Sequence, residues 1–125
     1  MKVLVCGSRD WGDYEAIDRR LSGLPGEHEE IEILHGAASR RPDGGPEESA
    51  DMLADRAARY WDFTVRRFPA DWERHGKRAG ILRNLAMLNE QPDLVIAFQR
   101  NGSRGTQHTI DEARRRGIPV EVHTA

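Results

Sequence analysis

Residues 93–122 read DLVIAFQRNGSRGTQHTIDEARRRGIPVEV, and this stretch decides the fold. Its first part, LVIAF, is a short apolar run that ends at a loop rich in turn-forming residues. A run of this kind predicts a strand that is buried on both faces. The segment 106–116 then predicts a helix that stops at Gly117, and IPVEV predicts a further strand. This order indicates a parallel sheet that is covered by helices.

The same alternation continues toward the N-terminus. Apolar runs that end in Gly, Pro or polar residues predict three more strands, at 2–6, 31–35 and 63–68. Together with the two strands described above, they predict an α/β protein with a mainly parallel five-stranded sheet. No repeat, linker or domain boundary interrupts the pattern, so we expect a single domain over residues 1–125.

Helices are expected between the strands. Asp13 is the predicted N-cap of the first helix, and Pro25 and Gly26 end it. A second helix is predicted to begin at Pro46, and the segment 70–76 predicts a loop or one helical turn. Apolar residues that share a helix face are expected to be buried: Tyr14, Ile17, Leu21 and Leu24; Leu53, Ala57, Tyr60 and Trp61; and Ile81, Leu85 and Leu88.

The composition limits the class of protein. The net charge of −2 gives no overall positive field that would attract nucleic acid. The single cysteine, Cys6, is interpreted as a buried structural thiol, and the five histidines lack metal-binding spacings, so no metal or cofactor is expected. No segment reaches the roughly 20 apolar residues of a membrane helix, and MKVLVCG is too short for a signal peptide. We therefore expect a soluble cytoplasmic protein with no membrane partner.

Ligands of an open parallel sheet bind beyond the C-terminal ends of its strands, near the point where the strand order reverses. The loops that follow the strands therefore hold the candidate binding residues. These are Gly7, Ser8, Arg9, Asp10 and Trp11 after the first strand, and His35 and Gly36 after the second. The backbone N–H groups of a glycine turn, together with a helix N-terminus, form a cradle for negative charge.

The loop NGSRGT has the composition of a phosphate site. Gly102 and Gly105 let the backbone approach a ligand closely. Thr106 is expected to cap the last helix, whose dipole favours an anion, and Ser103 precedes it in the same loop. Arg104 offers the forked guanidinium that suits phosphate. The loop matches neither the dinucleotide fingerprint nor the P-loop.

Other residues have both a structural and a functional interpretation. Arg83 and Asn84 either belong to a solvated helix face or reach a ligand from the side. A buried, hydrogen-bonded role is favoured for His35 over a catalytic one. Trp11 and Trp72 follow predicted strands, where each either stacks on a base or covers the edge of the core.

These motifs together resemble the SLOG superfamily, the Rossmann-like group that contains the LOG phosphoribohydrolases and the DprA/Smf proteins. The best match is its small YspA-like branch, which is common in bacteria and their phages. The matching pieces are VLVCGSRDW at 3–11, HGAA at 35–38 with AD at 50–51, FPADWERHGKRAG at 68–80, RNLAML at 83–88 and NGSRGT at 101–106. Together they run from one end of the chain to the other in the order of the family.

The resemblance implies a Rossmann-like three-layer sandwich that binds a nucleotide or a nucleotide-derived ligand. It implies ligand contacts from Gly7 to Arg9, from the His35–Gly36 turn, from Arg83 and Asn84, and from Gly102 to Thr106. It also implies a homodimer or a higher homo-oligomer.

The chain departs from the enzyme pattern of this superfamily at two places. The LOG enzymes carry Pro-Gly-Gly-x-Gly-Thr-x-x-Glu, whereas here Thr109 replaces the glutamate. The segment SRRPDGGPEES, at 39–49, follows the His-Gly turn where family members have a short Gly- and Ala-rich connection. For these reasons the hydrolase activity is not carried over to this chain.

Three functions remain open at this point. A nucleotide-binding protein that acts as a sensor or sequesters its ligand is favoured. The alternative is a phosphoribohydrolase-like N-glycosidase, in which Glu112, Asp10 or Asp51 supplies acid–base catalysis. A DNA-binding module of the DprA kind is less favoured, and its local basic patch would consist of Lys77, Arg78, Arg83, Arg100 and Arg104.

Overall fold

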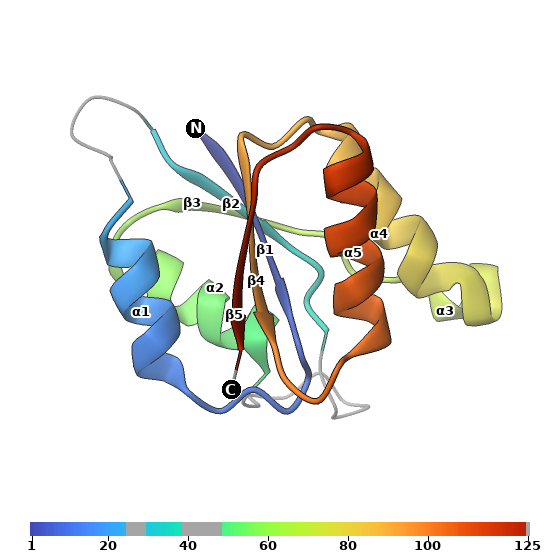
Figure 1. The fold of residues 1–125 in the computed structure, drawn as a ribbon, viewed down its shortest axis with the longest axis horizontal. Helices are drawn as coiled ribbons and strands as arrows, with labels where there is room; N and C mark the ends of the chain where they lie inside the picture. Colours follow the sequence, from blue (N-terminus) through green and yellow to red (C-terminus); the bar gives the residue numbers. More distant parts are fainter. Residues whose placement is uncertain (25–29, 39–48, 125) are drawn as a thin grey trace.

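The computed structural model describes residues 1–24, 30–38 and 49–124. Their centre is a sheet of five strands in the order β3-β2-β1-β4-β5 (Figure 1). The strands are β1 (Lys2–Gly7), β2 (Glu32–His35), β3 (Thr64–Arg67), β4 (Leu94–Gln99) and β5 (Val120–Thr124). All four strand pairings are parallel, so the predicted α/β class and five-stranded parallel sheet are confirmed.

Helices cover both faces of the sheet. Figure 1 shows α1 (Tyr14–Ser22) and α2 (Ala50–Tyr60) on one face, and α4 (Ala79–Asn89) and α5 (Arg104–Arg115) on the other. The short helices α3 (Trp72–His75) and η1 (Gly76–Arg78) precede α4, and α3 projects beyond the sandwich (Figure 1). Among the described residues, no helix has both the length and the apolar character that crossing a membrane requires.

The central strand β1 supplies side chains to two separate cores. Val3 and Val5 pack into the core beneath α1 and α2, which also contains Phe98. Leu4 and Cys6 point the other way, into the core beneath α4 and α5. This alternation follows from the two-residue period of a strand, and it explains why the run KVLVC is apolar on both faces. The result is a three-layer sandwich.

The strand order reverses between β1 and β4. The chain places β2 and β3 on one side of β1, and β4 and β5 on the other. Gly7, at the end of β1, pairs in register with Phe98 near the end of β4. The loops that leave these two strands therefore start side by side, at the position where an open parallel sheet binds ligands.

The helix boundaries differ in part from those predicted. Asp13 is the N-cap of α1, as predicted, and its carboxylate accepts a hydrogen bond from the Ala16 N–H at 3.1 Å. This helix ends at Ser22, before Pro25 and Gly26, which lie outside the described residues.

The second helix begins at Ala50, later than the predicted start at Pro46. Its N-cap is Ser49, whose hydroxyl accepts a hydrogen bond from the Met52 N–H at 3.2 Å. Because residues 39–48 lie outside the described part of the chain, the predicted start at Pro46 and nearly all of the predicted insertion at 39–49 do too.

Two predicted apolar faces are wrong in part. Tyr60 and Trp61, at the end of α2, are 73% and 43% exposed, because they extend past the sheet that the rest of this helix covers. Ile81 in α4 is 48% exposed. The buried residues of α4 are instead Ala79, Asn84, Met87 and Leu88. The helix can bury Asn84 because both ends of its amide are hydrogen-bonded, as described below.

Candidate functional site

A cavity of about 530 Å³ lies at the C-terminal ends of β1 and β4. We call it the β1–β4 cavity. Its walls come from the β1–α1 loop, the start of α2, the middle of α4, and the β4–α5 loop with the first turns of α5. The residues that line it are Cys6, Gly7, Ser8, Arg9, Asp10, Ala38, Asp51, Arg83, Asn84, Met87, Arg100, Asn101, Ser103, Gly105, Thr106 and Thr109.

The start of the β1–α1 loop is fixed by close packing. A side chain at Gly7 would place its Cβ 2.4 Å from the Ala50 Cβ and 2.5 Å from the Phe98 carbonyl oxygen. Glycine is therefore required here because α2 and β4 approach the backbone closely. The buried Ser8 hydroxyl donates to the Arg100 carbonyl at 2.9 Å and accepts from the Arg100 N–H at 2.7 Å. Ser8 thus joins the two loops that form the cavity.

The opposite wall is the start of α5. The N-cap is Ser103 rather than Thr106, so the prediction that Thr106 caps this helix is wrong. Thr106 lies one turn inside and donates its hydroxyl hydrogen bond to Ser103 Oγ at 3.1 Å. The helix begins nearer the strand than predicted, because Asn101 and Gly102, with φ of 55° and 61°, complete the turn before it. The N–H groups of its first turn lack intrahelical acceptors and carry partial positive charge.

Gly105 differs from the other glycine of the cavity. It lines the cavity, its φ is not in the left-handed region, and a Cβ built there meets no atom of the described residues within 4 Å. Neither backbone conformation nor internal packing therefore requires a glycine at this position. The missing side chain leaves room on the cavity wall.

Arg83 of α4 is held in a fixed position beside the cavity. Its Nη1 donates to the Gly36 carbonyl at 2.6 Å, and its Nε donates to Asn84 Oδ1 at 2.8 Å. A Cβ at Gly36 would lie 2.2 Å from Nη1, so the glycine after His35 makes room for this guanidinium. Asn84 Nδ2 in turn lies 3.4 Å from the Gly105 carbonyl and donates to it, which connects α4 to α5.

Three arginines and two aspartates line this cavity, and two of the arginines, Arg9 and Arg83, have no ion-pair partner among the described residues. Burial lowers the pKa of Arg83 below its ordinary value; the nearby Asp51 carboxylate opposes the shift, and the Arg9 guanidinium adds to it. Among the described residues, Arg83 has no carboxylate within ion-pair distance. Arg9 is exposed and makes no hydrogen bond or ion pair within that same part of the chain. With Arg100, three arginines therefore border one cavity.

The two acidic residues of the cavity, Asp51 and Asp10, lie on different walls. Asp51 is 5% exposed, and its Oδ2 accepts from the Ala38 N–H at 2.9 Å. Burial raises the pKa of its carboxyl above the ordinary value, although the Ala38 N–H and Arg83 oppose the shift. Asp10 is at the other side, where its carboxylate accepts from Asn101 Nδ2 at 3.3 Å. Burial also raises the pKa of Cys6, which confirms that it is a buried thiol and keeps it protonated.

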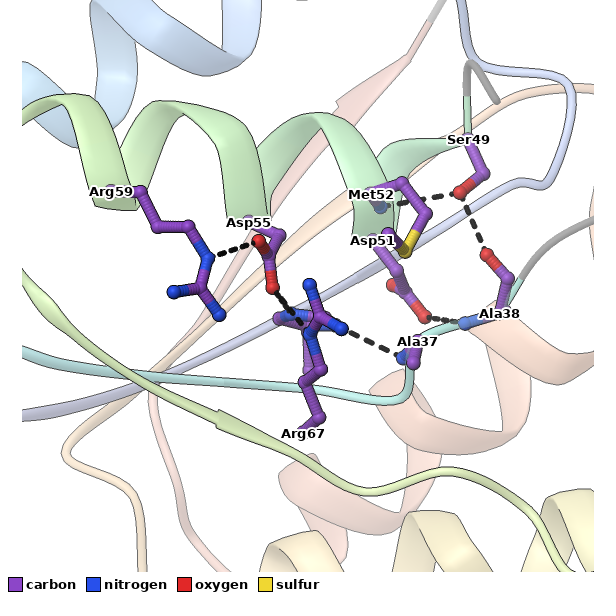
Figure 2. Close-up of polar contacts among 9 residues, drawn as sticks. Ala37, Ala38, Ser49, Asp51, Met52, Asp55, Arg59 and Arg67 are labelled. Carbon is purple, nitrogen blue, oxygen red and sulfur yellow. Dashed lines mark hydrogen bonds and ion pairs between the residues drawn. The ribbon is translucent and has the colours of Figure 1, made fainter. Parts of the chain in front are cut away.

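Behind the cavity, His35 belongs to a closed network of charges. Its Nδ1 accepts from the Ala37 N–H at 3.0 Å, so the proton of the neutral ring is on Nε2, which donates to Asp55 Oδ2 at 2.7 Å. Figure 2 shows Asp55 also bonded by Arg59 and Arg67, at 2.7 Å and 2.9 Å. His35 is fully buried, which confirms the structural interpretation of this residue.

The cavity brings together nine of the fourteen predicted ligand residues and leaves out five. Those that line it are Gly7, Ser8, Arg9, Asp10, Arg83, Asn84, Ser103, Gly105 and Thr106. His35 and Gly36 stand behind it and support its wall. Gly102 and Arg104 are exposed and do not line it, and Arg104 is the first residue of α5.

The fifth residue, Trp11, covers the edge of the core rather than the cavity. It is 2% exposed, its ring lies 5.4 Å from that of Phe98, and its Nε1 donates to the Asp13 carbonyl at 2.9 Å. It borders a neighbouring hollow of about 510 Å³, which shares Arg100 and Asn101 with the β1–β4 cavity.

Several lining residues were absent from the predicted ligand set. Arg100 and Asn101 stand immediately before the glycines of the predicted phosphate loop, and Asp51 was considered only as an acid–base group. The position of Arg100 directly after β4 could have indicated that it lines the cavity. The hydrogen bonds between Ser8 and the Arg100 backbone, which hold it there, cannot be read from the sequence. Thr109 lines the cavity one turn after Gly105, and its hydroxyl donates to the Gly105 carbonyl at 3.3 Å.

The chain is similar to a known protein family and to a phage protein. A family model described as "YspA, cpYpsA-related SLOG family" matches residues 1–75. The Gene 61 protein of Mycobacterium phage D29 is 36% identical over 125 residues, which covers 95% of this chain and 93% of the phage protein. No solved structure gives a significant match to the chain. The family model covers the β1–α1 loop and Asp51, and the similarity to the phage protein extends to the α4 and α5 walls.

Proposed function

The chain belongs to the YspA, cpYpsA-related SLOG family, and from this premise we propose that it binds a nucleotide or nucleotide-derived ligand in the β1–β4 cavity. The phosphate of the ligand lies between Arg83, Arg9 and the start of α5. The protein acts as a sensor of this ligand or sequesters it. Membership of the family supports a nucleotide-related role, and the charges of the cavity support the position of the phosphate.

The observation that carries the proposal is that Arg83, which lies close to a second guanidinium, has no ion-pair partner among the described residues. A guanidinium withdrawn from water loses hydration worth several kcal/mol, which an ion pair usually offsets. Arg83 has instead two neutral acceptors, the Gly36 carbonyl and the Asn84 amide, and a second guanidinium, Arg9, near enough to lower its pKa. A bound dianion would neutralise both guanidinium groups.

Phosphate suits this arrangement better than a carboxylate does. Its three oxygens can accept from two forked guanidinium groups and from the backbone N–H groups that open α5. The space beside Gly105 lets a bulky tetrahedral group approach those N–H groups. A volume of about 530 Å³ also falls within the range of small-molecule sites.

A matched pair of arginine variants tests the proposal. Arg9 and Arg104 are both exposed and lack partners among the described residues, but only Arg9 lines the cavity. We expect nucleotides from a panel to raise the unfolding temperature; a ligand at 100 times its Kd adds about 2.7 kcal/mol of stability. Arg9→Gln should weaken binding roughly ten-fold or more, since it removes a charged hydrogen-bond donor, and Arg104→Gln should leave the Kd unchanged.

Two results would count against this assignment. If no nucleotide or nucleotide sugar in the panel shifts the unfolding temperature, the protein does not bind this class of ligand. If Arg104→Gln weakens binding as much as Arg9→Gln does, the ligand occupies the outer surface near α5 and not the cavity.

A hydrolase acting on the same ligand is the second candidate, and Asp51 is the observation that favours it. Its carboxyl lines the cavity, and burial raises its pKa, as a general acid requires. Glu112 is no longer available for this role, because it pairs with Arg115 and Arg116 near the far end of α5. Release of free base from a bound nucleotide, lost in Asp51→Asn, would support the hydrolase. Nucleotide binding without release of free base would support the sensor function instead.

A further inference from the structure

Trp72 has no explanation within the fold itself. It is the first residue of α3, a four-residue helix that contains no buried residue. Its side chain is 51% exposed, although tryptophan is the largest apolar surface that a chain can place in contact with water. Within the described residues its indole N–H has no hydrogen-bond acceptor. The other exposed tryptophan, Trp61, differs in this respect, since its Nε1 donates to Asp18 Oδ1 at 2.8 Å.

Trp72 lies next to the guanidinium that borders the cavity. The two side chains meet at Gly80, in the first turn of α4. A Cβ at this glycine would lie 3.5 Å from the outer carbon of the Trp72 ring and 4.0 Å from Arg83 Nη2. Gly80 therefore lies between an exposed aromatic face and the half-buried guanidinium that lines the cavity.

A nucleotide has the same two chemical parts at a short separation. Its phosphate suits guanidinium groups, and its planar base suits an exposed aromatic face. Two tryptophans, Trp11 and Trp72, lie in segments that follow strands and are candidates for stacking on a base. Trp11 is not accessible to a base, because it is 2% exposed and packed on Phe98. Trp72 is then the tryptophan next to the Arg83 wall whose ring remains open to a ligand.

We propose that Trp72 is a base-stacking residue, against which the nucleobase of the ligand packs while its phosphate lies at Arg83. This inference rests on the function proposed above and makes it more specific, because it requires a ligand with an aromatic base and not merely a sugar phosphate. The stacking contact tolerates any base, since every base has a flat aromatic face.

The experiment compares a ligand that has a base with one that lacks it. The Kd of the four common nucleoside 5′-monophosphates and of ribose 5-phosphate is measured by calorimetry for the wild type, Trp72→Ala and Trp72→Phe. Removing a stacking aromatic weakens binding of a base by roughly 5-fold to 150-fold. We expect a loss of this size for the best-bound monophosphate in Trp72→Ala, a smaller loss in Trp72→Phe, and no change in the Kd of ribose 5-phosphate.

Trp61→Ala is the matched control, because it removes an exposed tryptophan at the end of α2. Its nucleotide affinity should equal that of the wild type. The inference is overturned, with the proposed function intact, if Trp72→Ala binds the monophosphates within two-fold of the wild type. It is also overturned if this variant loses ribose 5-phosphate and nucleotide equally, since Trp72 would then only support the Arg83 wall. If the wild type binds none of these compounds, the proposed function itself fails.

Discussion

Two buried carboxylates one turn apart on α2 have opposite surroundings (Figure 2). Asp55 accepts hydrogen bonds from His35, Arg59 and Arg67. Asp51 borders the cavity, where it accepts a hydrogen bond from the Ala38 N–H and has no arginine within ion-pair distance among the described residues. The protein itself satisfies Asp55, whereas it leaves Asp51, like Arg9 and Arg83, incompletely partnered. The difference separates groups that stabilise the fold from groups that we propose to contact a ligand.

The pKa values of the two carboxyls record this difference. Burial acts against ionisation of Asp55, but its hydrogen bonds from Arg67, Arg59 and His35 outweigh burial and hold its pKa below the ordinary value. For Asp51, burial is the larger effect, and its pKa is raised. Ionised Asp55 therefore stabilises the folded state at neutral pH, and ionised Asp51 destabilises it.

The largest expected effect comes from neutralising each carboxylate in turn. Asp55→Asn should reduce the free energy of unfolding by about 2–3 kcal/mol at pH 7, because it removes charged hydrogen bonds and leaves partly buried cations without an anion. The loss stays moderate since Arg59 and Arg67 reach water. Asp51→Asn should change the stability by less than about 1 kcal/mol, because the amide oxygen still accepts from Ala38 and a buried charge is removed. Urea unfolding measures both; equal losses would abolish the distinction.

The pH dependence of the same two variants sharpens the comparison. Stability from a carboxyl with a lowered pKa is complete above its unfolded-state pKa of about 4 and is lost as the pH falls toward the folded-state value. The disadvantage of Asp55→Asn should therefore shrink as the pH falls below about 4. A raised pKa has the opposite sign, so any advantage of Asp51→Asn should be greatest at neutral pH and shrink as the pH falls through the raised pKa toward about 4. Unfolding curves from pH 7 to pH 3 would show a constant difference if neither pKa were shifted.

The fold follows directly from the sequence because its signals are local. Short apolar runs between Gly- and Pro-rich loops fix the strands, and their alternation with helical segments fixes a parallel sheet. The position of the cavity also follows, since the C-terminal ends of neighbouring parallel strands lie at one edge. Arg9 and Arg83 could be predicted to border the same cavity from this rule about strand ends and from the resemblance to the SLOG superfamily.

The predicted ligand residues that do not line the cavity depend on distances that a sequence does not contain. Arg104 was placed with the phosphate, but α5 begins two residues before the predicted cap at Thr106, and Arg104 is exposed and does not line the cavity. Trp11 was placed in the ligand set because it is an aromatic residue in a strand-end loop, whereas its contact with Phe98 requires the β1–β4 pairing. Helical phase and the packing of side chains between elements decide such details.

Two glycines of the cavity differ in the same way as the two carboxylates: one is surrounded by protein atoms, and the other faces open space. At Gly7 the space for a side chain is already filled by Ala50 and the Phe98 carbonyl, at 2.4 Å and 2.5 Å. At Gly105 the space is open. Gly7→Ala should therefore destabilise the protein by about 1–3 kcal/mol through overpacking, as thermal or urea unfolding would show. It serves as the control for the change at Gly105.

Gly105→Ala gives the smallest change in stability and the one most specific to the ligand. The residue is helical and its φ is not positive, so alanine should raise the free energy of unfolding by about 0.5–1 kcal/mol. The added methyl group fills the room beside the first N–H groups of α5, so nucleotide affinity should fall although the protein is more stable. Unfolding without ligand and calorimetry with nucleotide measure the two effects separately. A variant that gains stability and keeps full affinity would mean that the phosphate does not approach the start of α5, because no other role in the fold requires the absence of a side chain at this position.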